Sequence, residues 1–277
     1  MDKNLKKLLI KTKKSVFTQQ VGNNSSKFKG DGYDFVELRE YEDGEDIRKI
    51  DWVISAKMQK PFIKVFHPQR ELRVNIIPIL NGSVYFGTQK FKQDIIVEIS
   101  AILGYSASAN GDNYGSYIYN ENLILNTKYT KSLLGVDKMC EKIKNYISLN
   151  KQCDYKNLAT SIFKQIKQKS ILFLIGDFFD TSKLNIKLLS KKHEVFIVIV
   201  RDRFEENPTQ LGDVNLTDSS SGKVFDGEFS GSLIKNYQKI VKQNDHSFYT
   251  DLKQSGIEFT KIYTDENPII KLMKLFR

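Results

Sequence analysis

Three nearly continuous apolar runs divide the larger, C-terminal part of the chain. They cover residues 74–80, 170–175 and 195–200. Runs of this length predict strands that are covered on both faces, as in a parallel sheet. Because such strands need helices on both sides, the runs predict an α/β architecture.

The segments between and after these runs carry helical or weaker strand patterns. Phe91, Ile95, Ile99 and Leu103 recur at a four-residue spacing, which predicts a helix over 91–109. Further strands are predicted at 116–119, 123–125, 213–217, 223–226 and 257–263, and further helices at about 132–148, 157–168, 184–190, 231–255 and 267–275. Strands and helices that alternate in this way predict a doubly wound, mostly parallel, Rossmann-like sheet.

The first 72 residues differ from this pattern. Leu5, Leu8, Leu9 and Val16, with lysines between them, predict a helix over 3–17. We favour a surface helix that packs on a core, and the alternative is a basic amphipathic helix that touches a membrane or a partner. An alternating stretch from Phe62 predicts a strand. We therefore expect an N-terminal extension over 1–72 and an α/β domain over 73–277.

Charge is unevenly distributed over the 277 residues, although their sum is +10. Residues 1–29 carry a net charge of +7, residues 30–51 carry −6, and the remainder carries +9. This distribution favours a lysine-rich solvated surface over a nucleic-acid footprint, so we expect no nucleic-acid partner. Cys140 and Cys153 are the only cysteines. Without a disulfide framework, a signal peptide or a transmembrane segment, the sequence predicts a cytoplasmic protein.

Candidate chemistry gathers where the predicted parallel strands end. Ligands of open α/β sheets bind beyond the carboxyl ends of the strands, where Asn81 and Ser83, Asp177 and Asp202 follow apolar runs. Neither a phosphate-binding Gly-x-x-x-x-Gly-Lys-Ser/Thr loop nor a Gly-x-Ser-x-Gly elbow is present. The three histidines lack the spacing of a zinc site. Nothing pairs the aspartates with a nucleophile, so we predict that the protein is not an enzyme.

A dense motif between Gly30 and Glu71 identifies a family resemblance. Its matching positions are Gly30, Gly32, Asp34, Phe35, Leu38, Arg39, Tyr41, Gly44, Asp46, Arg48, Ile50, Asp51, Trp52, Ser55, Ala56 and Lys57. Further matches are Gly111, Asp112, Gly115, Asp202, Glu205, Pro208, Gly212 and Asp218. With these residues the chain resembles the MoxR-associated proteins of domain-of-unknown-function family 58, which carry a von Willebrand factor A-like domain.

The resemblance implies a metal-ion-dependent adhesion site, in which Asp-x-Ser-x-Ser, a Thr and an Asp hold a hard cation such as Mg²⁺. Aligned on the family, these positions fall on Ile79, Asn81, Ser83, Lys156 and Asp177. Ile79 offers no oxygen, and a lysine at 156 brings a positive charge. We therefore expect a degenerate site without metal or other cofactor, in which Lys156 pairs with Asp177. Asp112 and Asp202 are expected on the same rim.

The motif residues Arg39, Tyr41, Asp46, Arg48, Asp51 and Trp52 have two interpretations. They form a partner-contact surface, or, as we favour, arginine–carboxylate pairs and a core Trp52 pin the segment onto the sheet. The family resemblance implies an adaptor or chaperone-like role beside a MoxR-type AAA+ ATPase, in contact with other proteins. The alternatives are a membrane-peripheral interaction module that uses residues 3–17, and a metal-dependent hydrolase that uses the rim aspartates.

Overall fold

The computed structural model describes residues 3–23, 35–66, 72–179, 181, 184–210 and 212–275. The chain forms two compact units, Met1–Phe17 with Leu72–Arg277 and Thr18–Glu71. We call the first the sheet unit and the second the hairpin unit. One division falls between Glu71 and Leu72, next to the division expected between 72 and 73, and Met1–Phe17, expected in the N-terminal extension, is grouped with the sheet unit.

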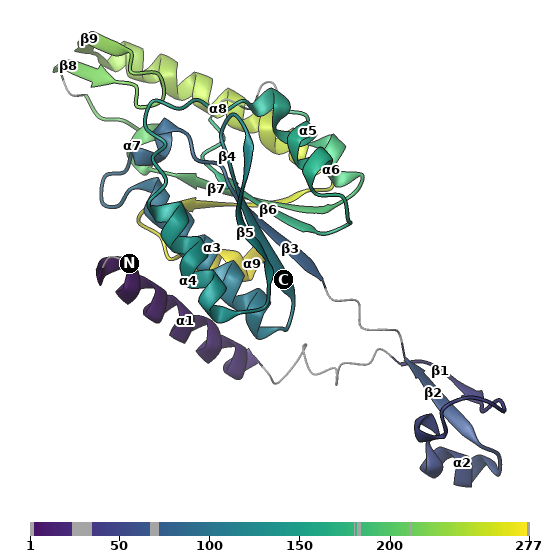
Figure 1. The fold of residues 1–277 in the computed structure, drawn as a ribbon. Coiled ribbons are helices and arrows are strands. Elements are labelled where there is room, and N and C mark those ends of the chain that lie inside the picture. Colours follow the sequence, from purple (N-terminus) through teal and green to yellow (C-terminus); the bar gives the residue numbers. More distant parts are fainter. Residues whose placement is uncertain are drawn as a thin grey trace. The chain divides into compact units, whose positions relative to one another are not determined.

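The sheet unit contains most of the regular elements (Figure 1). They are, in chain order, α1 (Lys3–Asn23, of which the first part belongs here), β3 (Arg73–Pro78), η2 (Gly82–Tyr85), α3 (Lys92–Ala109), β4 (Asn113–Tyr119), β5 (Leu123–Thr130), α4 (Leu133–Lys144), α5 (Tyr155–Gln165), β6 (Ile171–Gly176), α6 (Lys187–Ser190), β7 (Glu194–Arg201), α7 (Arg203–Glu206), β8 (Gly212–Thr217), β9 (Val224–Phe229), α8 (Gly231–Gln254), β10 (Glu258–Tyr263) and α9 (Pro268–Leu275).

A six-stranded sheet runs through this unit in the order β10-β7-β6-β3-β4-β5. All neighbours pair in parallel except β5, which pairs antiparallel with β4 at the sheet edge. The mostly parallel α/β sheet predicted from the apolar runs is therefore confirmed. β8 and β9 form a separate antiparallel hairpin.

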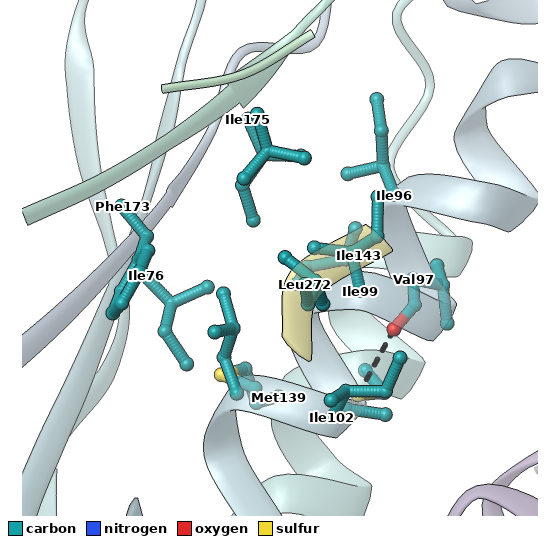
Figure 2. Packing of buried hydrophobic residues seen from close by; sticks show 14 of the residues in the cluster. Ile76, Ile96, Val97, Ile99, Ile102, Met139, Ile143, Phe173, Ile175 and Leu272 are labelled. Atoms are coloured by element: carbon teal, nitrogen blue, oxygen red, sulfur yellow. Dashed lines mark hydrogen bonds between the residues drawn. The ribbon is translucent and has the colours of Figure 1, made fainter. Parts of the chain in front are cut away.

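Side chains of the central strands alternate between two hydrophobic clusters, because successive residues of a strand point to opposite faces. In β6, Phe173 and Ile175 face one cluster, and Leu172 and Leu174 face the other. Helices α3, α4 and α9 cover the first face, and α5, α6 and α8 cover the second (Figure 1). Figure 2 shows the first cluster, in which strand residues such as Ile76 lie opposite α3 and α4.

The N-terminal helix α1 contributes to the first cluster. Leu5, Leu9 and Val16 are buried there, whereas Ile10 is exposed. The buried residues recur at helical spacing, so one apolar stripe packs on the sheet unit and the lysines between them remain outside. This packing confirms the predicted helix and the surface-helix interpretation of its apolar face.

The hairpin unit is small. Its elements are β1 (Phe35–Glu40), η1 (Ile47–Lys49), α2 (Trp52–Met58) and β2 (Phe62–Phe66). β1 and β2 pair antiparallel. Asp51 begins α2 by accepting hydrogen bonds from the amides of Val53 and Ile54, which is the usual role of an aspartate at a helix start. Ser55 and Ile63 are the buried side chains among those described in this unit.

The predicted strand at 123–125 is longer in the structure, where β5 continues to Thr130. Polar residues after Leu125 break the apolar pattern. Asn126 is nevertheless buried, and its side-chain amide donates hydrogen bonds to Ser116 Oγ and the Met139 carbonyl, at 3.3 Å each. These tertiary partners let a polar sequence continue an edge strand.

Candidate functional site

The candidate site lies at the carboxyl ends of β3 and β6, the two central strands. From β3 the chain crosses to β4 on one side, and from β6 it crosses to β7 on the other. Such a reversal of direction is where open α/β sheets bind ligands. The site therefore lies where the sequence analysis predicts it, and we call Asn81, Ser83, Lys92, Asp177 and Glu205 the rim cluster.

Ser83 and Asp177 join the two strand ends. The Ser83 hydroxyl makes a short hydrogen bond to Asp177 Oδ2 and lies 2.9 Å from Asn81 Oδ1. The turn that presents Ser83 depends on Gly82, whose amide donates to the Lys151 carbonyl at 2.8 Å. A side chain at Gly82 would overlap the Ser219 backbone. The predicted neighbours Asn81, Ser83 and Asp177 thus meet in one place.

Ile79 distinguishes this site from one that could bind a metal ion. Its side chain is fully buried and belongs to the second hydrophobic cluster, beside Gly176. The alkyl group therefore points into the core beneath the rim. It contributes packing where the resemblance would require a carboxylate.

Lys92 supplies the cation of the rim cluster. Its side chain is fully buried, and its Nζ lies 3.2 Å from Asp177 Oδ2 and 2.5 Å from Glu205 Oε1. Two carboxylates therefore share one ammonium in a water-poor environment. Removal of one partner of such a pair typically costs about 3–5 kcal/mol, because the other charge stays buried.

The predicted pairing of Lys156 with Asp177 is wrong. Lys156 is exposed on the first turn of α5. Its neighbour Tyr155 is buried against Phe178, and adjacent helix residues point in different directions, so Lys156 faces solvent. Lys92 takes the expected place instead. A sequence signal for Lys92 existed, since it precedes Ile96 and Ile99 at helical spacing on a buried face.

Arg201 supports the rim cluster from beneath. Its Nε donates to the Asp177 carbonyl at 2.5 Å, and one terminal nitrogen donates to the Phe178 carbonyl and to Asp245 Oδ1, at 3.0 Å each. Phe178 has a positive φ of 50°. The guanidinium stacks 3.4 Å from the centre of the Phe179 ring. Arg201 thereby holds the turn after β6 in the conformation that presents Asp177. Sequence reasoning did not single out Arg201.

The two carboxyl groups that contact Lys92 have pKa values that are shifted in opposite directions. Burial opposes ionisation of Asp177, but Lys92, the Ser83 hydroxyl and Arg201 together hold its pKa below the usual value. Burial raises the pKa of Glu205, and Lys92 only partly offsets this effect. Asp177 is therefore the firmly charged partner of Lys92, and Glu205 is the weaker one.

Asp202 lies at the carboxyl end of β7, as predicted, and is buried. It accepts hydrogen bonds from the Thr88 amide at 2.9 Å and from the hydroxyls of Thr88 and Thr264 at 3.0 and 2.5 Å. It also begins α7 in a capping box with Glu205. Although burial opposes ionisation, these donors, Thr264 foremost, lower the pKa of Asp202. Its oxygens thus tie three segments together.

Asp112 does not lie on this rim. It immediately precedes β4, which begins at Asn113, and therefore lies at the amino end of a parallel strand. Its amide donates to the Ala107 carbonyl at 2.9 Å, closing the turn after α3. The prediction failed because it placed Asp112 by family position and not by the direction of the following strand.

The motif residues of the hairpin unit pair with one another. Arg39 binds Glu45, and the Tyr41 hydroxyl donates to the Glu45 carbonyl at 3.1 Å. Arg48 binds Asp46 at 3.0 Å. The arginine–carboxylate pairs that the favoured structural interpretation expected are therefore present, but they join residues of the hairpin unit to one another, and pinning of the segment onto the sheet stays a prediction. The interpretation is wrong for Trp52, because that side chain is 66% exposed.

A divalent cation, which the resemblance implies, does not fit the rim cluster. The residues described contain no group of three or more His, Cys, Asp or Glu side chains that could hold a metal ion. Ile79 offers no ligand atom, and the Asp177 carboxylate already forms an ion pair with the Lys92 ammonium. Nor does Ser83 face a free base, because its carboxylate partner is also bound by Lys92. The arrangement therefore joins the segments that follow β3 and β6 to the first residue of α3 and to α7.

Comparison with known proteins gives a family match and distant relatives. The family described as “Protein of unknown function DUF58” matches residues 37–247. The uncharacterised proteins Mb1516 of Mycobacterium bovis and Rv1480 of Mycobacterium tuberculosis are each 20% identical over 258 residues, which cover 91% of this chain and 81% of theirs. The hypothetical protein BatB of Bacteroides thetaiotaomicron aligns at 14% identity and a TM-score of 0.45, covering 74% of this chain and 96% of BatB.

Proposed function

This chain belongs to the DUF58 family, and from that premise we propose that it is a non-enzymatic protein-binding module that serves a MoxR-type AAA+ ATPase as an adaptor or chaperone-like partner. Within this proposal the sheet unit is a von Willebrand factor A-like domain. Its strand order and its single antiparallel edge strand support that assignment. The resemblance in the motif of the hairpin unit suggests the partner.

The observation that carries the proposal is that the carboxylates of the rim cluster, and Asp202 next to it, are already engaged by other side chains. Asp177 and Glu205 bind Lys92, and Asp202 binds Thr88 and Thr264. Carboxylates engaged in this way serve poorly as nucleophile or general base, because protonation or attack would break a buried ion pair. Recognition of proteins by surface contacts needs no such group, which supports a binding role over hydrolysis.

A reconstitution experiment tests the proposal. The tagged full chain is incubated with native lysate of its source organism, and the bound proteins are identified by mass spectrometry. We expect a MoxR-type AAA+ ATPase among them, and direct binding when that ATPase is purified and titrated by calorimetry. Recovery without any AAA+ ATPase, or absence of binding by the purified ATPase, contradicts the partner assignment.

The alternative function, a metal-dependent hydrolase, is tested on the same purified protein. We expect no turnover of generic phosphate and ester substrates with or without Mg²⁺. Metal-dependent turnover that disappears in Asp177→Ala contradicts the non-enzymatic role.

A membrane-peripheral role remains a second candidate because exposed lysines flank Ile10 on α1, whose side chain is 59% exposed. None of the described helices is long and apolar enough to cross a bilayer. The apolar stripe of α1 is already buried, which favours the adaptor proposal. Liposome flotation of the full chain, compared with a variant in which Lys6, Lys7, Lys13 and Lys14 are glutamine, separates the two. Equal recovery of both at physiological salt removes the membrane role.

A further inference from the structure

Lys92 is the one lysine buried among the residues that the structure describes. Transfer of an ammonium from water into a protein interior costs several kcal/mol. Close carboxylates offset this cost, and here Asp177 and Glu205 lie at 3.2 and 2.5 Å from Nζ. The arrangement therefore surrounds the Lys92 ammonium with acceptors at the carboxyl ends of the central strands.

The atoms around this charge are those that hard divalent cations bind. Asp177 and Glu205 provide carboxylate oxygens, and Ser83 and Asn81 add a hydroxyl and an amide oxygen beside Asp177. Mg²⁺ and Mn²⁺ prefer oxygen ligands of this kind. With Lys92 in place, an arriving cation would meet a like charge at contact distance in a buried site, and the repulsion would exclude it.

We propose that the Lys92 ammonium is a tethered cation that closes the rim cluster to divalent ions, and that its removal opens the cluster to one Mg²⁺ or Mn²⁺ ion. The ion would take the place of Nζ, between the Asp177 and Glu205 carboxylates. This inference rests on the geometry of the cluster and is independent of the proposed ATPase partner.

Lys92→Met is the variant that tests it. Methionine has no charge and ends one heavy atom short of Nζ, so the replacement leaves both carboxylates and a space where Nζ lay. Lys90→Met is the matched control, because Lys90 is exposed and two residues away in sequence. Each protein is titrated with Mn²⁺ and with Mg²⁺ by calorimetry, and its melting temperature is recorded with and without the ion.

We expect no uptake by the wild-type chain or by Lys90→Met, and uptake of one ion by Lys92→Met. Millimolar ion should raise the melting temperature of Lys92→Met by about 5 °C, since an ion that binds only the folded state stabilises it. The double variant Lys92→Met/Asp177→Asn should lose this shift. Stoichiometric uptake by the wild-type chain, or none by Lys92→Met, overturns the inference.

Loss of the ammonium also leaves Asp177 and Glu205 without the cation that both contact, and their mutual repulsion can prevent folding. In that case Lys92→Met is refolded in Mn²⁺, and recovery of folded protein only with the ion supports the inference. Lys92→Met/Glu205→Gln provides a further variant, in which the positive charge of Arg201 still favours the ionised Asp177 carboxylate. We expect that variant to bind Mn²⁺ about tenfold more weakly than Lys92→Met, since it has lost one charged ligand. Absence of uptake by both variants overturns the inference.

Discussion

Gly82 carries a packing requirement at the residue scale. A Cβ at this position would overlap the backbone of Ser219, whose carbonyl accepts a hydrogen bond from the Asn150 amide at 2.9 Å. Since backbone cannot move aside as a side chain can, we expect Gly82→Ala to lower the free energy of unfolding by about 2 kcal/mol in urea denaturation. Gly231→Ala is the control, because its Cβ would meet only the flexible end of Gln210. Equal stability of Gly82→Ala and wild type would contradict this account.

The two carboxyl groups that share Lys92 should respond differently to neutralisation. Asp177→Asn removes a charge whose pKa is lowered in the folded state, so at pH 7 we expect a loss of about 3 kcal/mol in the free energy of unfolding. The stabilisation by the ionised Asp177 carboxylate is fully present above the ordinary carboxyl pKa of about 4. It is lost as the pH falls through the lowered pKa of Asp177 in the folded state. The difference between wild type and Asp177→Asn should therefore be constant above about pH 5 and should shrink as the pH falls below about 4.

Glu205→Gln is the matched control for that series. The pKa of Glu205 is raised by burial, so its ionisation costs stability as the pH rises past the ordinary value. Glutamine also keeps the acceptor for the Asp202 amide. We expect Glu205→Gln to stay within about 1 kcal/mol of wild type at pH 7 in the same urea denaturation. A larger loss in Glu205→Gln than in Asp177→Asn would reverse the assigned roles.

At the scale of single side chains, sequence reasoning located Asn81, Ser83 and Asp177 because each directly follows a predicted strand. It assigned the cation to Lys156, because the family alignment placed that residue at the position of the metal-binding Thr. Lys92 is far from Asp177 in sequence and reaches it only because α3 begins beside β6. No periodicity reveals such a tertiary pairing. The available signal was the position of Lys92 on an apolar face of the predicted helix. An isolated lysine at such a position is best interpreted as buried.

At the element scale, α1 shows how a basic helix joins a core. Leu9 is 3% exposed and its neighbour Ile10 is 59% exposed. We expect Leu9→Ala to lower the free energy of unfolding by about 3 kcal/mol, because it removes buried methyl groups and leaves a cavity. Ile10→Ala should change it by less than about 0.5 kcal/mol, as for an exposed site. Both are measured by urea denaturation, and equal effects would mean that α1 is not packed as described.

Among the elements, the buried strands were the most predictable, because a short, continuous apolar run is compatible with few secondary structures other than a buried strand. The end of α8 was equally clear. Gly256 at φ 65° follows the helix, and the amides of Gly256 and Ile257 bond back to Lys253 and Leu252, which is the Schellman arrangement. The extent of β5 was not predictable, since its second half is polar and depends on partners from β4 and α4.

At the scale of the whole molecule, the two units differ in how much they bury. The sheet unit has two large hydrophobic clusters, whereas Ser55 and Ile63 are the buried side chains described in the hairpin unit. Exposed apolar residues are instead prominent there, namely Ile47, Trp52, Val53 and Met58. A unit with so little buried surface opens at low cost in free energy. The sequence analysis expected Trp52 in a core, and its exposure in the hairpin unit is the feature that the apolar pattern did not predict.

This difference in burial predicts the order of proteolytic cleavage. In limited trypsin digestion followed by mass spectrometry, sites in the hairpin unit such as Lys57 and Lys60 should be cut first. Lys90 and Lys223, exposed sites of the sheet unit, serve as controls for accessibility. If the proposed AAA+ ATPase binds the exposed apolar residues of the hairpin unit, adding it should slow cleavage at Lys57 and Lys60 and leave the controls unchanged. Earlier cleavage of the controls would contradict the stability difference, and equal slowing at all sites would place the contact elsewhere.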